Sequence, residues 1–78
     1  MKKMTLKDLS PGQKARVARI NRTGAIGRRL VEMGFGPGCE VKVERYAPLG
    51  DPMEIKLKGT HISLRKIEAE MVEVEQEG

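Results

Sequence analysis

The chain has 78 residues, of which 38% are hydrophobic and 33% charged, and its formal net charge is +4. A chain of this length forms one domain over residues 1–78, and its small core buries only about 60% of the surface of the unfolded chain. This size excludes a cofactor-binding domain beside a catalytic one. No apolar run approaches the ~20 residues that span a bilayer. The first lysines are not followed by the apolar run of a signal peptide, so we expect a cytoplasmic protein.

The charge is distributed unevenly along the chain. Residues 1–39 carry nine basic and two acidic side chains, a charge of +7, whereas residues 40–78 carry six basic and nine acidic ones, a charge of −3. A basic half suggests nucleic acid or anionic lipid as a partner. Solvated charges on the surface of a small domain explain the same pattern, and we favour this interpretation.

The first elements are short. Leu6 and Leu9 are three residues apart and can hold a helical turn over residues 5–9 against the core. A strand follows over residues 14–20. Its alternation of apolar and polar residues breaks before Ile20, which predicts a β-bulge near Ala18–Arg19.

A helix is expected between the first two strands. Thr23 is the candidate N-cap, and the helix runs from about Gly24 to Gly34. Its apolar stripe consists of Ile26, Leu30 and Met33. Gly34 can adopt the left-handed conformation that ends a helix, and Pro37 prevents its continuation.

In the second half of the chain, charged and apolar residues alternate, which is the pattern of strands with one solvent-exposed face. Strands are expected at residues 39–46, 53–58, 61–64 and 71–75, with a helical turn over 65–70 and frayed residues at 76–78. The expected fold is therefore mainly β, a small barrel of about five strands with one short helix between strands 1 and 2.

Several motifs, in this order and spacing, resemble FeoA, the ferrous iron transport protein A family. They are Leu6-x-x-Leu9-x-x-Gly12, Leu30-x-x-Met33-Gly34-Phe35-x-Pro37-Gly38, Ala47-Pro48-Leu49-Gly50-Asp51-Pro52, Leu64-Arg65 with Glu68-Ala69, and Val72-x-Val74. The resemblance implies an SH3-like barrel and a small cytoplasmic accessory protein of bacterial ferrous iron uptake. It implies FeoB as partner, a membrane transporter with a GTP-binding domain, so this chain would meet the membrane only through FeoB. It implies no enzymatic activity.

The residues themselves provide no reaction centre. His61 and Cys39 are each the single residue of their type, and a nucleophile needs a base and an orienting group beside it. Glu73, Glu75 and Glu77 share one strand face, which we interpret as a solvated edge and not as an iron site. We therefore expect no catalytic residue, no cofactor and no tight metal site.

Two groups of residues are candidates for partner binding. The first is the outer face of the helix, with Arg28, Arg29 and Glu32. The second is the proline-containing loop and its flanks, with Tyr46, Pro48, Leu49 and Met53. For Leu49 two interpretations stay open, because it can either contact a partner or close one end of the barrel.

The alternative hypothesis is a small basic SH3-like domain that binds nucleic acid through Arg16, Arg19 and Arg22. Base stacking needs aromatic side chains, and Phe35 and Tyr46 are the only two in the chain. We therefore expect no nucleic-acid partner. A metal-sensing fragment that acts as an oligomer is a third hypothesis, and the oligomeric state stays open.

Overall fold

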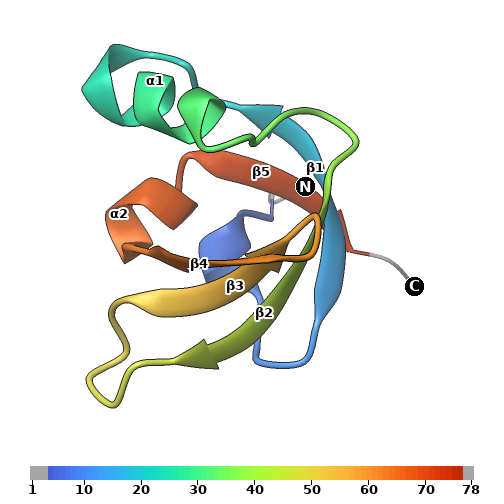
Figure 1. Ribbon diagram of the computed structural model, residues 1–78, viewed down its shortest axis with the longest axis vertical. Coiled ribbons are helices and arrows are strands. Elements are labelled where there is room, and N and C mark those ends of the chain that lie inside the picture. Colours follow the sequence, from blue (N-terminus) through green and yellow to red (C-terminus); the bar gives the residue numbers. More distant parts are fainter. Residues whose placement is uncertain (1–3, 77–78) are drawn as a thin grey trace.

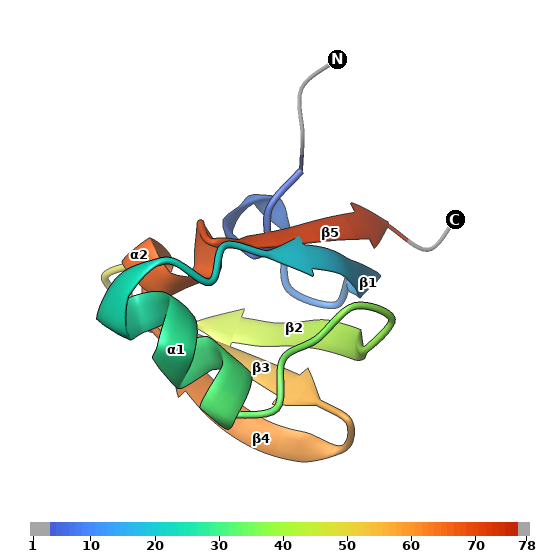
Figure 2. The same cartoon turned by 90° about the horizontal axis from the view of Figure 1, so that it is seen from above.

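The computed structural model describes residues 4–76, which form one curled antiparallel sheet with two short helices beside it (Figures 1 and 2). The elements in chain order are η1 (Leu6–Asp8), β1 (Lys14–Ile20), α1 (Gly24–Glu32), β2 (Glu40–Tyr46), β3 (Met53–Leu57), β4 (Thr60–Leu64), α2 (Lys66–Ala69) and β5 (Val72–Gln76). The strand order is β4-β3-β2-β1-β5. The predicted fold class, five strands with one short helix between the first two, is confirmed.

Two β-bulges bend the sheet. The pairing of β1 with β5 shifts between Val17 and Arg19, as the break in alternation predicted. The pairing of β2 with β3 shifts between Val43 and Arg45, which we did not predict. A bulge bends its strand and increases the local twist, so these two shifts allow a short sheet to curl around one core.

The core is formed by the inward side chains of all five strands, with Leu6, Leu9, Leu30, Phe35 and Ala69 from the other segments. Its strand residues are Ala15, Val17, Ile20, Val41, Val43, Met53, Ile55, Leu57, Leu64, Val72 and Val74. The predicted fraying from residue 76 is wrong for Gln76, which lies in β5 opposite Ala15. Glu77 and Gly78 lie outside the described residues.

The C-terminal end of α1 follows the prediction closely. Gly34 has a φ of +106°, and its N–H donates to the carbonyl of Val31 at 3.0 Å. The N–H of Phe35 donates to the carbonyl of Leu30 at 3.1 Å, and both of these side chains are buried. This is the hydrogen-bond pattern of a Schellman motif with its apolar contact, and it directs the chain from α1 into β2.

The N-terminal end of α1 is where the sequence predicted it, but it is capped in another way. Thr23 is the N-cap residue, but its side chain makes no capping hydrogen bond. Instead, the backbone N–H of Thr23 donates to the side-chain Oδ1 of Asn21 at 3.0 Å. Asn21 thus orders the turn that leads into α1.

Candidate functional site

Three elements lie on the same side of the barrel: α1, α2 and the β2–β3 loop of residues 47–52 (Figures 1 and 2). The Arg29 guanidinium on α1 pairs with the Glu68 carboxylate on α2 at 2.9 Å. The backbone N–H of Lys66 on α2 donates to Oδ1 of Asp51 in the loop at 3.0 Å. These two contacts link α1 to α2 and α2 to the loop.

Each of these three elements carries one exposed large apolar side chain. Val31 on α1 is 41% exposed, Ile67 on α2 is 58% exposed and Leu49 in the loop is 94% exposed. They are the exposed large hydrophobic residues of the part of the chain that the structure describes. We call Val31, Ile67 and Leu49, with the charged side chains around them, the helix–loop surface. Exposed apolar groups rimmed by charge are typical of protein interfaces.

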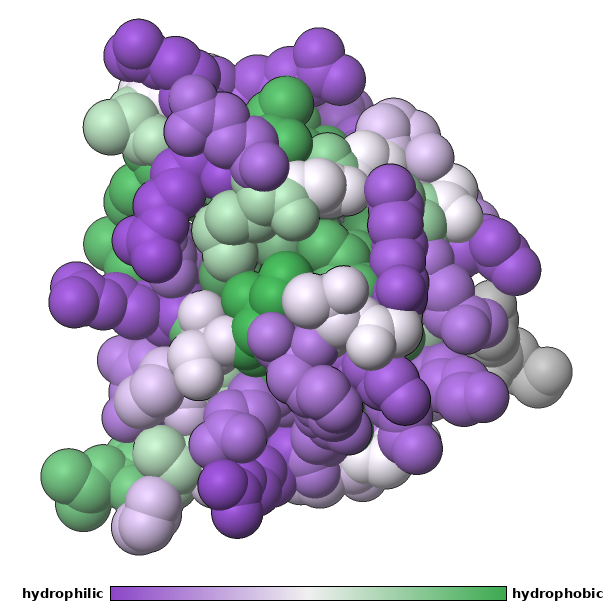
Figure 3. Space-filling model, viewed as in Figure 1, coloured by the Kyte–Doolittle hydropathy of each residue, from purple (hydrophilic) through white to green (hydrophobic). Residues whose placement is uncertain are grey.

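Leu49 extends from an ordered loop. The N–H of Ala47 donates to the carbonyl of Pro52 at 2.9 Å, and the N–H of Gly50 donates to the carbonyl of Ala47 at 2.7 Å. In Figure 3 the apolar end of this loop projects at the lower left of the molecule. The alternative in which Leu49 closes one end of the barrel is therefore wrong, and Leu49 and its exposed neighbour Pro48 remain available to a partner.

Two other candidates near this loop are not free contact residues. Met53 is 0% exposed, because it is the first of the inward residues of β3 and lies opposite Leu64. Its assignment to partner binding is wrong. Tyr46 is half-buried, and its hydroxyl donates to the carbonyl of Leu9, which fixes the ring to the segment before β1.

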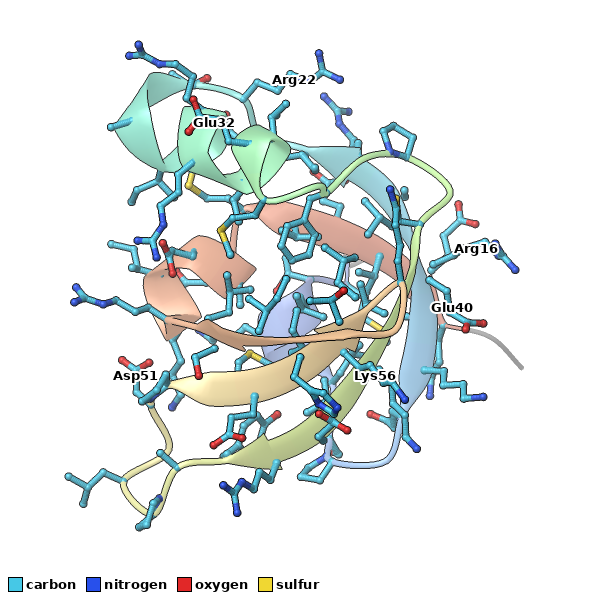
Figure 4. All side chains as sticks on the ribbon, in the orientation of Figure 1. Arg16, Arg22, Glu32, Glu40, Asp51 and Lys56 are labelled. Carbon is cyan, nitrogen blue, oxygen red and sulfur yellow. The ribbon has the colours of Figure 1, made fainter. Side chains whose placement is uncertain are left out.

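The three candidates on α1 are all exposed, as predicted, but they differ in their surroundings. The side chain of Arg29 is held by Glu68, which is only 3% exposed and also accepts the backbone N–H of Arg65 at 2.9 Å. Among residues 4–76, Arg28 and Glu32 form no ion pair, so their charges remain available to a partner. Figure 4 shows Glu32 on α1. Arg29 stabilises the site, whereas Arg28 and Glu32 are able to contact a partner.

The sequence reasoning missed Val31 and Ile67. Val31 lies outside the stripe formed by Ile26, Leu30 and Met33, and a helical projection would therefore have placed an apolar side chain on the outer face of α1. Ile67 follows from no such pattern, because α2 has only four residues. The buried carboxylate of Glu68 was also missed, since a charged residue is rarely buried unless it is paired.

Cys39 and His61, the two side chains considered for catalysis, each have one polar contact. The Sγ of Cys39 donates to the carbonyl of Gly34 at 3.7 Å, and Nδ1 of His61 lies 2.6 Å from a carboxylate oxygen of Glu44. Between residues 4 and 76, no three His, Cys, Asp or Glu side chains lie together in a way that could hold a metal ion. No helix in that same range is long and apolar enough to cross a bilayer.

The arginines of the nucleic-acid hypothesis are not arranged around a stacking platform. Arg16 donates from Nη1 to the carbonyl of Gly38 at 3.0 Å, and Arg19 lies 3.9 Å from the carboxylate of Glu73. Phe35 is only 4% exposed, and the hydroxyl of Tyr46 is bound to Leu9. The aromatic faces that would stack on bases are thus used within the fold.

Comparisons with known proteins give a consistent result. The FeoA domain model matches residues 4–76. A Porphyromonas gingivalis protein that fuses Fe(2+) transport protein A to the Fe(2+) transporter FeoB is 36% identical over 72 residues. That match includes 92% of this chain and 8% of the fusion protein, so the chain spans less than a tenth of that relative.

Solved structures agree with the family assignment. Iron(II) transport protein A from Clostridium thermocellum has a TM-score of 0.87 and 45% identity, over 94% of this chain and 45% of that one. FeoA from Stenotrophomonas maltophilia, a zinc complex described as a prokaryotic SH3 domain protein, has a TM-score of 0.82 and 36% identity over 95% of both chains. Because the family model matches almost the whole chain and the folds agree, this chain belongs to the FeoA family.

Proposed function

We propose that this chain is an accessory protein of ferrous iron transport, which binds the FeoB transporter through the helix–loop surface at the cytoplasmic face of the membrane. The observation that carries the proposal is the exposure of Leu49, Ile67 and Val31 on three elements that contact one another through an ion pair and a hydrogen bond. Exposed apolar side chains with charged side chains beside them are the combination from which protein interfaces are built.

The fusion protein of Porphyromonas gingivalis supports FeoB as the partner. It joins a domain similar to this chain to the Fe(2+) transporter FeoB in one polypeptide. Covalent linkage keeps two domains at a high effective concentration. A FeoA chain that acts on a separate FeoB polypeptide needs a non-covalent contact in place of this link, and the helix–loop surface offers one.

The expected mode of action is modulation through binding. A bound protein shifts the equilibrium of its partner towards the conformation that it binds more tightly. Three apolar side chains on short elements are typical of a small interface, below about 1,200 Å², which suits a contact that forms and dissociates during transport.

Substitution of Leu49 tests the proposal. Full burial of a leucine side chain contributes about 1.5–3 kcal/mol, so Leu49→Asp should weaken binding to FeoB about tenfold or more. Because Leu49 is 94% exposed, the substitution should leave the stability of the barrel unchanged. The measurement is co-purification and affinity with full-length FeoB and with its soluble GTP-binding domain.

The matched control is Ala18→Asp, which also places a carboxylate at an exposed apolar position, on β1. This variant should bind FeoB as the unmodified chain does. The proposal is wrong if the folded chain binds neither form of FeoB, or if Leu49→Asp binds as tightly as Ala18→Asp.

A further inference from the structure

A row of basic side chains crosses the outer face of the sheet. The pairing register places Lys14 of β1 opposite Lys42 of β2, and Lys42 opposite Lys56 of β3. The residues that alternate with them, Ala15, Val41 and Ile55, are completely buried, so the three lysines face outwards. Like charges directly opposite each other across two strands are destabilising, and here the arrangement occurs twice in succession.

The three lysines open onto a hollow of about 340 Å³ in the surface. Its lining consists of Lys14, Glu40, Val41, Lys42, Lys56, Lys58 and Gly59. This volume lies in the range of small-molecule sites, which is about 300–1,000 Å³. Four ammonium groups and one carboxylate give the lining a charge of +3, and within residues 4–76 none of the four lysines has an ion-pair partner.

The fourth lysine occupies an unfavourable backbone position. Lys58 has a φ of +52° and precedes Gly59, which has a φ of +86°, in the turn between β3 and β4. A two-residue hairpin turn with positive φ at both positions favours Asn, Asp or Gly at the first of them, because a longer side chain crowds the backbone there. The chain thus accepts a strained lysine at the rim of a hollow that already contains three.

We propose that this hollow binds an anion with two phosphate groups. Lysine acts as a point charge that suits phosphate, whereas planar carboxylates are better matched by arginine. One phosphate monoester carries about −1.5 to −2 charges at pH 7, so two such groups balance the charge of +3. The lining contains no aromatic side chain, so recognition rests on the phosphates.

The site lies away from the helix–loop surface. In Figure 4, Lys56 and Glu40 lie on the side of the sheet away from Asp51 and the β2–β3 loop. Occupation of the hollow therefore leaves the helix–loop surface accessible. The two phosphate groups can belong to a soluble anion or to neighbouring headgroups of an anionic lipid layer.

Binding of inorganic pyrophosphate tests the proposal directly, by calorimetry and by thermal melting against sodium chloride of equal ionic strength. Pyrophosphate should raise the melting temperature of the unmodified chain more than sodium chloride does. Removal of the two central lysines in Lys42→Gln/Lys56→Gln should lower the affinity about tenfold or more. Without pyrophosphate and at low salt, this variant should melt at the same or a higher temperature, because the repulsion within the row is relieved.

The matched control is Arg22→Gln/Arg28→Gln, which removes the same charge from exposed positions outside the hollow and should keep the affinity within about twofold. A second arm uses vesicles of phosphatidylcholine with and without phosphatidylglycerol. Vesicle binding that requires phosphatidylglycerol and is lost in Lys42→Gln/Lys56→Gln identifies a lipid headgroup as the source, and pyrophosphate binding alone identifies a soluble anion.

Three results would overturn the proposal. The first is equal stabilisation of the unmodified chain by pyrophosphate and sodium chloride, with no binding to either kind of vesicle. The second is equal loss of binding in the lysine variant and the control. The third is binding of a single-stranded oligonucleotide in place of pyrophosphate, which would assign the basic charge to nucleic acid.

Discussion

The buried carboxylate of Glu68 on α2 makes two contacts, one with each of its oxygens, and one of them reaches α1. One oxygen accepts the backbone N–H of Arg65, and the other lies 2.9 Å from the guanidinium of Arg29. A buried charge that loses its partner costs more than the net value of the pair, because the remaining group is still desolvated. Arg29 therefore stabilises the packing of α1 against α2.

Removal of this arginine should destabilise the fold. Arg29→Ala should lower the free energy of unfolding by about 1–3 kcal/mol, since it leaves the Glu68 carboxylate without its ionic partner. Arg28→Ala, at the exposed neighbouring position, should change it by no more than about 0.5 kcal/mol. Urea denaturation followed by circular dichroism gives both values, and equal effects of the two substitutions would contradict the assigned role.

The exposure of individual residues was only partly predictable from the sequence. Two patterns gave opposite predictions for Met53. Its alternation with Ile55 and Leu57 predicts a buried side chain, whereas its position beside the loop of Leu49 suggested an exposed one. The alternation is correct, because a strand with one buried face determines the direction of each side chain in turn. The exposure of Leu49 depends on the direction in which the loop extends from the barrel, and no local sequence pattern predicts that direction.

The position of α1 depends on a close approach between two backbone segments. A Cβ added to Gly27 would meet backbone atoms of Arg22 and would lie 2.6 Å from the carbonyl oxygen of Asn21. Helix propensity alone indicates only that a glycine weakens a helix. In the structure, the absent side chain allows α1 to lie against the turn that precedes it.

Gly27→Ala should therefore destabilise the protein even though alanine favours helix. Overpacking against backbone that has little room to move should cost about 1–3 kcal/mol of the free energy of unfolding. The control is Gly36→Ala, where an added Cβ meets nothing within 4 Å and the φ is not left-handed. This control should be neutral or stabilising by up to about 1 kcal/mol. Thermal and urea denaturation measure both, and a stable Gly27→Ala variant would contradict the close approach.

At the level of elements, the sequence predicted what depends on periodicity and local chemistry. The strands, the first bulge and the ending of α1 just before Gly34 all follow from spacing within one segment. The row of Lys14, Lys42 and Lys56 does not, because it depends on the register between strands. The bulge between Val43 and Arg45 shifts that register, and nothing in the alternation of β2 showed it.

The whole molecule presents two surfaces of different chemistry on one small barrel. The helix–loop surface carries the exposed apolar side chains of Val31, Ile67 and Leu49, whereas the hollow across β1, β2 and β3 is lined mainly by lysines. The family assignment and the fusion relative make FeoB the first partner to test.

Chemical-shift mapping by NMR of the isotopically labelled chain, with unlabelled FeoB or its GTP-binding domain added, tests this account most directly. The account predicts that the backbone amides most perturbed are those of the β2–β3 loop around Leu49, of α2 around Ile67 and of α1 around Val31. The amides of β1, β2 and β3 beside the lysine row should change little. Perturbations confined to those three strands, or none at saturating FeoB, would contradict it.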